Sequence, residues 1–331
     1  MKKNIAIVAG GDSSEWTVSL KSAAGLESFI NRQLYNTYLV TIIGQTWQVE
    51  LANNIKIPID KSDFTCVLNG EKIRFDLAYI IIHGTPGENG ILQGYFQLIG
   101  MPFSCCDVLP SALTFNKFVC NHYLQSFGIT VAPSLLLRRG ETLSDSNIAQ
   151  IGLPCFVKPN VGGSSFGVTK VKQFADLQAA LDKAFAESDE VIIEALLEGT
   201  EVTCGMYRTR HKTVVFPITE VVTANEFFDF DAKYNGQSQE ITPARIESTI
   251  AANIASTTQR IYRLINARGI IRVDYIICNG LIQLLEVNTV PGMTPASFIP
   301  QQIRAAGLNI GDVLTDIIED AIETHVSPNS K

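Results

Sequence analysis

The chain has 331 residues, of which 46% are hydrophobic and 18% are charged, so it has enough apolar material for well-packed cores. This length exceeds what one hydrophobic core usually holds, which predicts two or three domains. The formal net charge is −7, whereas a general nucleic-acid-binding protein needs a basic face. We therefore expect no nucleic-acid partner.

The cysteines and the hydropathy pattern indicate a cytoplasmic protein. The seven cysteines are odd in number and lack paired C-x-x-C spacing, which argues against a disulfide framework or a structural zinc site. Most lie in apolar runs, where a reduced cysteine acts as a small hydrophobe. The N-terminal run in MKKNIAIVAGG is too short for a signal peptide, and no later segment approaches the length of a membrane span. We expect no membrane partner.

Strands and helices alternate in the first third of the chain. KNIAIVAGG, YNTYLVTIIG and DLAYIII have strand patterns, and helices are expected after GGDSSE and over ILQGYFQLIG. This alternation predicts an α/β domain with a mostly parallel sheet over residues 1–106, which binds ligands at the carboxyl ends of its strands. The loops 10–15 and 83–90 lie at that edge. His83 is a candidate ligand there, and a loop-capping histidine is the alternative.

The pattern changes after Cys105-Cys106. One amphipathic helix is expected over 111–128, and GLPCFVKPNVGGSSFGVTKV predicts a strand, a glycine-rich loop and a strand. We assign 107–196 to a smaller central α+β subdomain and 197–331 to a C-terminal subdomain. The latter should contain strands, an irregular segment, and helices over roughly 245–267, 299–306 and 310–324.

Two apolar runs that flank Asn279-Gly280 predict a β-hairpin with polar residues inside it. These residues are Arg272, Asp274, Glu286 and Asn288. A two-residue turn would pair 278 with 281 and send Asp274 and Glu286 to opposite faces. A three-residue loop closing on a left-handed Gly280 would pair 277 with 281. It would place all four polar residues on one face and Val273, Tyr275, Leu285 and Val287 on the other. We favour this second register because it separates polar from apolar residues more cleanly.

Two carboxylates and an amide oxygen that converge from stiff strands form an all-oxygen site. Such a site suits Mg²⁺, with water and phosphate oxygens completing the coordination. The alternative is an ordinary antiparallel hairpin with one solvated face, where such charges cost little.

The glycine-rich sequence Gly162-Gly163-Ser164-Ser165-Phe166-Gly167 predicts a phosphate-binding lid. Glycines let backbone N–H groups approach phosphate oxygens, and the serine hydroxyls add donors. It lacks the G-K-[ST] ending of a P-loop, and a plain glycine turn is the alternative. Lys158 in the apolar strand CFVKP strengthens the lid interpretation, because a buried lysine needs an anion.

Two further segments could contact a nucleotide. Glu194 and Glu201, near the joint of two subdomains, could hold an adenine and a ribose, or be an exposed pair beside a turn. The irregular segment 223–245 could be a lid that supplies Lys233 and Tyr234, or a surface loop pinned by its phenylalanines.

Taken in order, the motifs HGTPGENG, NK, KPNVGGSSFG, EFFDFDAKYNG, RVD and LLEVNTVPGMTPAS resemble those of D-alanine–D-alanine ligases of the ATP-grasp superfamily. The similarity spans residues 4–322. It implies an N-terminal α/β domain followed by a two-subdomain ATP-grasp fold with ATP between two antiparallel sheets. It also implies a homodimer. The implied reaction is phosphorylation of one D-alanine by MgATP and attack by the amine of a second, yielding a dipeptide for peptidoglycan.

The resemblance gives the candidate residues specific roles. It assigns the ATP phosphates to Lys117, Lys158 and Lys233. It places Glu194 and Leu197 at the adenine and Glu201 on the ribose. It makes Asp274, Glu286 and Asn288 ligands of two Mg²⁺ ions, for which Mn²⁺ can substitute.

The remaining implied roles concern the amino-acid substrates. Arg272 and the Gly292 backbone would stabilise the tetrahedral oxyanion, and Ser297 would contact the carboxylate of the second substrate. Ser164 and Tyr234 would form a hydrogen-bonded pair that closes the lid. A tyrosine at 234 favours dipeptide over depsipeptide formation, because relatives that use D-lactate carry a histidine in the equivalent lid.

The first loop departs from the family pattern. The family commonly carries a glutamate two residues before the serine of this loop, where it holds the ammonium of the first substrate, but EWTVS has Thr17 there. Glu15 or the His83 loop is expected to compensate. The departure keeps open another ATP-grasp carboxylate–amine ligase with different substrates. A nucleotide-binding protein without activity is the third alternative.

Overall fold

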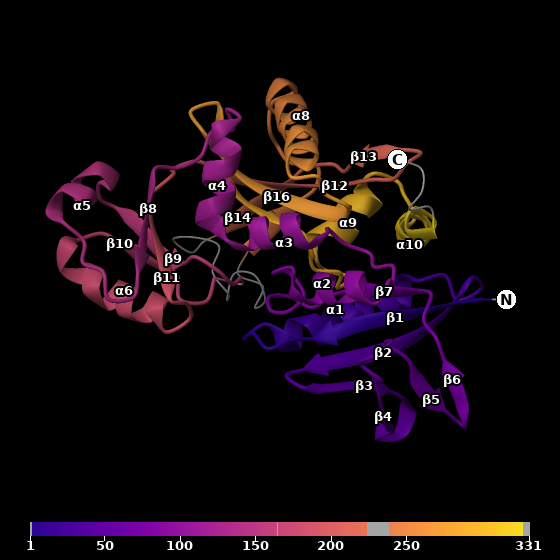
Figure 1. The fold of residues 1–331 in the computed structure, drawn as a ribbon. Coiled ribbons are helices and arrows are strands. Elements are labelled where there is room, and N and C mark those ends of the chain that lie inside the picture. Colours follow the sequence, from indigo (N-terminus) through magenta and orange to yellow (C-terminus); the bar gives the residue numbers. More distant parts are fainter. Residues whose placement is uncertain (1, 164, 224–237, 327–331) are drawn as a thin grey trace.

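The structure, a computed structural model, describes residues 2–163, 165–223 and 238–326 (Figure 1). Within these ranges, no helix combines the length and apolarity needed to cross a membrane. Three sheets form the framework, each with its own hydrophobic core.

The first sheet has the strand order β4-β3-β2-β1-β7. β1 pairs in parallel with β2 and β7, whereas β3 pairs antiparallel with β2 and β4, so the side of the sheet that holds β2, β1 and β7 is parallel and the other side is antiparallel. Its strands are β1 (Lys3–Gly10), β2 (Tyr35–Ile43), β3 (Thr46–Glu50), β4 (Lys56–Pro58) and β7 (Leu77–Ile80), with a separate hairpin of β5 (Cys66–Leu68) and β6 (Glu71–Ile73). The helices of this part are α1 (Trp16–Phe29) and α2 (Ile91–Leu98).

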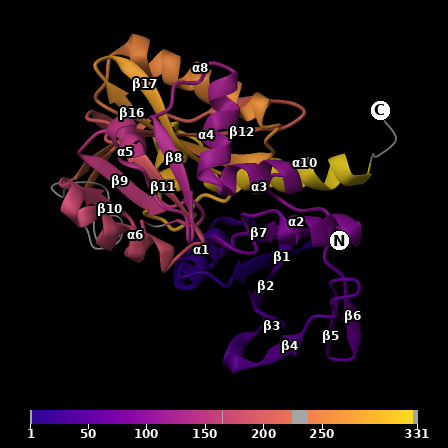
Figure 2. The same cartoon turned by 60° about the vertical axis from the view of Figure 1, so that its left-hand side comes forward.

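The second sheet, β10-β9-β11-β8, is antiparallel. Its elements are β8 (Ser134–Arg138), α5 (Asp145–Ile151), β9 (Cys155–Pro159), β10 (Thr169–Val171), α6 (Leu177–Phe185) and β11 (Glu190–Ala195). Figure 2 shows this sheet beside the third one, and the glycine-rich loop joins β9 to β10.

The third sheet has the order β15-β14-β12-β16-β17, with β13 paired to β12. Its elements are β12 (Thr200–Arg208), β13 (Thr213–Val215), β14 (Thr219–Thr223), β15 (Ser238–Ile241), α8 (Ser248–Leu264), β16 (Gly269–Cys278), β17 (Leu281–Asn288), α9 (Phe298–Ala305) and α10 (Ile310–Val326). The three C-terminal helices lie close to their predicted positions.

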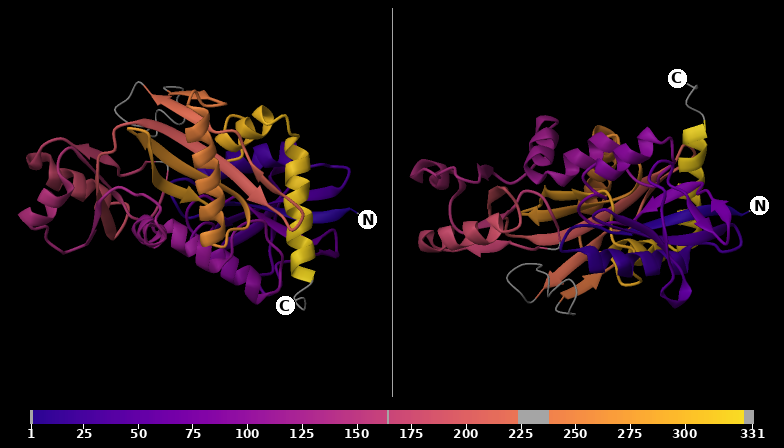
Figure 3. Two further views of the ribbon diagram at one scale, coloured as in Figure 1. Left: turned by 90° about the horizontal axis from the view of Figure 1, so that it is seen from above. Right: turned by 60° about the horizontal axis from the view of Figure 1, so that its bottom comes forward.

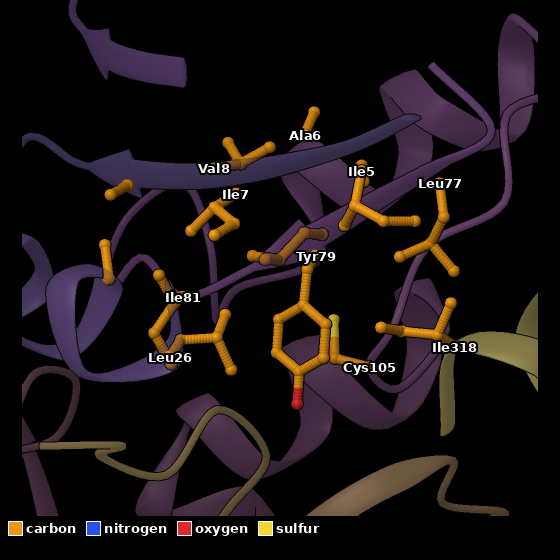
Figure 4. Packing of buried hydrophobic residues seen from close by; sticks show 14 of the residues in the cluster. Ile5, Ala6, Ile7, Val8, Leu26, Leu77, Tyr79, Ile81, Cys105 and Ile318 are labelled. Atoms are coloured by element: carbon orange, nitrogen blue, oxygen red, sulfur yellow. The ribbon is translucent and has the colours of Figure 1, made fainter. Parts of the chain in front are cut away.

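The C-terminal helix α10 contacts both the first and the third sheet, because it touches β7, α1 and β16 (Figure 3). Ile318 of α10 is fully buried in the core of the first sheet, near Leu77 (Figure 4). Burying such a side chain stabilises a fold by roughly 1.5–3 kcal/mol. The chain end therefore fixes one sheet relative to another.

The single helix expected over 111–128 is wrong. The structure has α3 (Val108–Phe115) and α4 (Lys117–Ser126), separated at Asn116, which has an extended ψ of 99°. The Asn116 side chain accepts a hydrogen bond from the Val119 N–H, as an N-cap does. An asparagine inside an apolar periodicity thus starts a second helix.

α3 and α4 lie against β17, and buried residues of 106–131 join the core of the third sheet. The first part of the central segment 107–196 therefore packs against the C-terminal subdomain and shares its core. The predicted boundaries at 107 and 197 stay a prediction.

The expected turn of the β16–β17 hairpin is also wrong, although its consequence holds. Asn279 and Gly280 have φ of 50° and 78°, and Cys278 pairs with Leu281 across a two-residue turn. Two positive φ values are typical of a type I′ turn. A β-bulge then shifts the register between Asp274 and Tyr275.

The bulge restores the shared polar face. Tyr275 pairs with Leu284, but Asp274 pairs with Glu286, so Leu285 is the extra residue. Leu284 is buried in the core with Tyr275. Leu285, expected on the core face, instead lines a cavity with Asp274 and Glu286.

Candidate active site

Two neighbouring cavities lie between the three sheets. One, of about 270 Å³, is lined by the first loop, the His83 loop, β17 and the segment 289–298. The other, of about 430 Å³, lies between the second and third sheets and is lined by β9, β11, β12 and the glycine-rich loop. Residues shared by both linings include Lys117, Arg272 and Glu286. A ligand in one cavity therefore lies next to a ligand in the other.

The predicted polar set stands on the wall between these cavities. Asp274 pairs across the hairpin with Glu286, and Arg272 with Asn288, so all four side chains share one face. Arg272 donates to both oxygens of Asp274, from Nε at 2.8 Å and Nη2 at 2.7 Å. The Asn288 Nδ2 lies 3.1 Å from Asp274 Oδ2 and 3.5 Å from Glu286 Oε1.

This donor set fits Mg²⁺ or Mn²⁺. Carboxylate oxygens of Asp274 and Glu286 both approach the Asn288 amide, and rotation of that amide would point its oxygen to the same place. Hard cations prefer such oxygen ligands. In the described part of the chain, no group of three His, Cys, Asp or Glu side chains forms a metal cluster, so the set depends on the amide.

Two lysines carry positive charge to the cavities. Lys117 Nζ donates to the Gly162 carbonyl at 2.5 Å and lies 3.5 Å from Glu286 Oε2. Lys158 Nζ donates to Glu194 Oε2 at 2.6 Å, and both side chains are largely buried. The buried lysine thus has the anion that its burial requires. Lys158, Glu194, Glu201 and Ser165 all line the larger cavity.

The first loop presents Glu15 and not Thr17. Glu15 is 7% exposed and lines both cavities, whereas Thr17 is exposed and lines neither. A Cβ built on Gly163 would lie 2.7 Å from Glu15 Oε2, so the carboxylate lies directly against the glycine-rich loop. Position 17, at which the resemblance places a residue that contacts the first substrate, therefore does not face the cavity: α1 begins at Trp16, and Thr17 is exposed.

His83 is buried at the smaller cavity, where its Nε2 lies 3.0 Å from Ser22 Oγ. Burial lowers the pKa of His83, although the Glu15 carboxylate opposes this shift. A neutral imidazole at neutral pH follows, hydrogen-bonded to Ser22, which holds the ring at the cavity wall.

Gly292 and Ser297 close the same cavity from the other side. Ser297 Oγ accepts from the Thr294 N–H at 3.1 Å and lies 2.8 Å from Thr294 Oγ1. A Cβ on Gly292 would lie 3.0 Å from Ser297 Oγ, so only glycine leaves this corner uncrowded.

Some predicted residues are not placed at the site. Leu197 lies between β11 and β12 and lines neither cavity. Ser164, Lys233 and Tyr234 lie outside the described residues, so their roles stay predictions. The structure adds Glu88 and Glu240, which the sequence analysis missed. Glu88 lies in the loop 83–90 that was expected at the cleft, and this position was the signal available in the sequence. Glu240 lies in the segment 223–245 that was predicted as an irregular lid, in which residues 238–241 instead form β15.

Glu88 is a half-buried acid among other acids. Burial, followed by the negative charges of Glu15 and Glu286, raises the pKa of Glu88 to about 8. The hydrogen bond from the Gly84 N–H and the positive charge of Lys117 lower this pKa but do not cancel the increase. The Gly84 N–H donates to Glu88 Oε2 at 2.7 Å. Burial likewise raises the pKa of Glu240, against a hydrogen bond from Gln301 and the charge of Arg272.

We expect this shift to make folding stability depend on pH. The folded state keeps the Glu88 proton up to about pH 8, whereas the unfolded chain loses it near 4.5. The contribution of the Glu88 proton to the free energy of unfolding is therefore fully present below pH 4.5 and is lost as the pH rises to 8. The side chain of the Glu88→Gln variant stays neutral at every pH. The Tm of this variant minus the Tm of wild type, both measured without ligands, should therefore increase by more than about 2 °C between pH 5 and 8.5. Exposed Glu71→Gln is the control, and a constant difference for Glu88→Gln would contradict the shift.

Comparisons with known proteins agree with this geometry. A family described as D-ala D-ala ligase N-terminus matches residues 4–106, and one described as D-ala D-ala ligase C-terminus matches residues 123–319. A D-alanine–D-alanine ligase of Phocaeicola vulgatus is 62% identical over 322 residues, which are 97% of this chain and 99% of that protein.

Two solved structures resemble the whole chain. The VanG D-Ala:D-Ser ligase from Enterococcus faecalis has a TM-score of 0.84 at 30% identity, over 98% of this chain and 100% of that one. The D-alanine–D-alanine ligase from Bacillus anthracis complexed with ATP has a TM-score of 0.78 at 26% identity, over 98% and 99%. The predicted fold class is confirmed.

Proposed function

The chain belongs to the D-alanine–D-alanine ligase family, and we propose that it joins two D-alanine molecules at the expense of ATP, for peptidoglycan synthesis. The observation that carries this proposal is the placement of Arg272, Asp274, Glu286 and Asn288 on one face between two cavities. One cavity takes ATP, and the other takes the amino acids.

The larger cavity suits the nucleotide. Lys117 and Lys158 bring positive charge to the phosphates, and backbone N–H groups of the glycine-rich loop add donors. Glu194 and Glu201 accept hydrogen bonds from adenine and ribose. Asp274, Glu286 and Asn288 would hold Mg²⁺, with Mn²⁺ as a substitute. The ions would supply neutralisation of phosphate charge.

The smaller cavity suits two amino acids. The carboxylate oxygen of the first D-alanine attacks the γ-phosphorus, ADP leaves, and an acyl phosphate forms. The amine of the second attacks the carbonyl carbon, loses a proton, and phosphate leaves with the electron pair of the broken C–O bond. Arg272 and the Gly292 N–H stabilise the oxyanion between these events. Glu15 holds the first ammonium, and Ser297 contacts the second carboxylate.

Phosphate release from ATP with D-alanine as the sole amino substrate tests the proposal, with the dipeptide identified by mass. The resemblance to a D-Ala:D-Ser ligase makes D-serine the first competitor to add, and D-lactate the second. Turnover only with other amino acids would favour a related ligase. No turnover with any would favour a nucleotide-binding protein without activity. Preferential depsipeptide formation would contradict the role of Tyr234.

We also propose a cytoplasmic homodimer. α2 and α3 lie side by side and expose large apolar side chains, with Ile91 63%, Leu98 88% and Leu109 74% exposed. Exposed apolar patches of this kind are typical of protein interfaces.

The variant Leu98→Glu with Leu109→Glu should shift the protein from dimer to monomer in light scattering, because two charges would be buried unpaired. Ile55→Glu, at a position 53% exposed elsewhere, is the matched control and should remain dimeric. A monomeric wild type would contradict the homodimer, and a dimeric double variant would contradict this interface.

A further inference from the structure

A separate cavity of about 820 Å³ lies away from the active site. Its lining shares no residue with the two active-site cavities. Four segments form it: residues 102–105 beside β7, residues 208–210 at the end of β12, residues 262–269 after α8, and part of α10. Figure 2 shows α10 running between the first and third sheets.

Arginines dominate this lining, and we call it the arginine cavity after Arg208, Arg210, Arg263 and Arg268. Asp320 is the one carboxylate among the lining residues that the structure describes. The formal net charge of the whole chain is −7, so such a concentration of positive charge runs against the composition. A hollow lined by one sign of charge attracts the opposite sign.

Two of the four guanidinium groups are uncommitted. Arg210 pairs with Asp320 and Glu323, and Arg268 Nη1 lies 3.3 Å from Asp107 Oδ1. Arg208 and Arg263 have no side-chain hydrogen bond or ion pair with any described residue. Two free guanidinium groups therefore line the same concave surface.

The side chain of Arg263 is not needed to cap the C-terminal end of α8 either. Its last carbonyl groups accept from the chain that follows, with Asn266 N at 3.1 Å from Arg263 O and Ala267 N at 2.9 Å from Tyr262 O. These bonds satisfy the orphan carbonyls of the helix terminus. A cation at the end of α8 stabilises the helix by only about 0.3–1 kcal/mol through the helix dipole. This effect does not explain the position of Arg208, which lies on β12.

The floor of the cavity is rigid. The Tyr262 hydroxyl, on a side chain 3% exposed, donates to the Gly269 carbonyl at 3.0 Å. Gly269 has a φ of +65°, and a Cβ there would lie 2.2 Å from the Ser104 carbonyl oxygen. The first and third sheets thus meet at a fixed distance, and a ligand would meet a preformed surface.

We propose that the arginine cavity binds a small polyanion that carries two or more phosphate or carboxylate groups. The volume lies in the range of small-molecule sites, about 300–1,000 Å³. Guanidinium groups bind both kinds of anion in a bidentate manner. The concave shape, to which α10 contributes one wall, favours a small molecule over a macromolecule. The bound anion would contact both the first and the third sheet.

Calorimetric titration of the full chain tests this proposal. The active site is first saturated with a non-hydrolysable ATP analogue and D-alanine in the absence of magnesium, because both titrants chelate that ion, and the ionic strength is held constant. Tripolyphosphate and citrate are then titrated separately. Wild type should bind at least one of them with a Kd below 1 mM, and the preferred probe distinguishes phosphate from carboxylate chemistry. Arg208→Gln with Arg263→Gln should weaken that binding at least about tenfold.

The matched control is Arg32→Gln with Arg74→Gln, which removes the same charge from exposed positions in the segments between α1 and β2 and between β6 and β7. It should bind the probe within about twofold of wild type. If both double variants bind the probe equally weakly, the weakening is caused by the lower net charge of the protein and the proposal is overturned. Binding weaker than 1 mM for both probes would overturn it as well. Equal Tm values for the two double variants show that folding is not the cause.

Discussion

Asp274→Asn is expected to lower kcat at least about a thousandfold, or roughly 4 kcal/mol of transition-state stabilisation. Asp274 is both a candidate metal ligand and the partner of both Arg272 donor groups. Its neutralisation removes one negative charge from the metal site and leaves the Glu286 carboxylate, 3.9 Å from Arg272 Nη2, as a charged neighbour of the guanidinium group. Phosphate release under saturating ATP and D-alanine measures the loss.

The magnesium dependence separates the two roles of Asp274. If it holds the ion, the half-saturating Mg²⁺ concentration rises in Asp274→Asn. If Asp274 only anchors Arg272, that concentration is unchanged, and the metal assignment is overturned. Asp189→Asn is the matched control, because Asp189 forms a surface ion pair with Arg139 and its side chain is 88% exposed. Exposed pairs of this kind contribute about 0–1 kcal/mol, so its kcat should stay within about twofold.

Glu15→Gln is expected to raise the Michaelis constant for the first D-alanine roughly 30- to 100-fold. A buried charge-assisted hydrogen bond to an ammonium contributes about 2–3 kcal/mol, and glutamine keeps the shape of the side chain without its charge. The dependence of the initial rate on D-alanine concentration separates the first binding event from the second. The Michaelis constant for ATP should change much less.

Position 17 supplies the control for this result. Thr17→Glu should change the Michaelis constant of the first site less than tenfold, because residue 17 is exposed and lines neither cavity. A larger gain would mean that Glu15 does not hold the ammonium. An unchanged constant in Glu15→Gln would contradict the assignment in the same way.

Much of the site could be predicted because it depends on local spacing. Arg272 and Asp274, and likewise Glu286 and Asn288, are two residues apart, so each pair stays on one face of its strand in any register. Lys158 could be found because a lysine inside an apolar strand needs an anion, and Glu194 supplies it. These inferences use only the period of a strand and the cost of burying a charge.

Other features could not be predicted because they depend on distant contacts. Periodicity did not reveal the break at Asn116, because residues on either side keep the same apolar face. The first loop allowed either Glu15 or Thr17 to face the substrate. The start of α1 at Trp16 decides, since each helical residue turns the side chain by about 100°.

The sequence by itself determined the strand-helix alternation, the glycine-rich loop and the polar residues of the β16–β17 hairpin. The tertiary structure alone decided how the two halves of that hairpin meet. An Asn-Gly turn sets one register, and the bulge at Leu285 changes it before Asp274 reaches Glu286. The extra residue is accommodated because Leu284 packs into a core while Leu285 lines the cavity. Both environments are built by residues far away in the chain, and no local pattern encodes them.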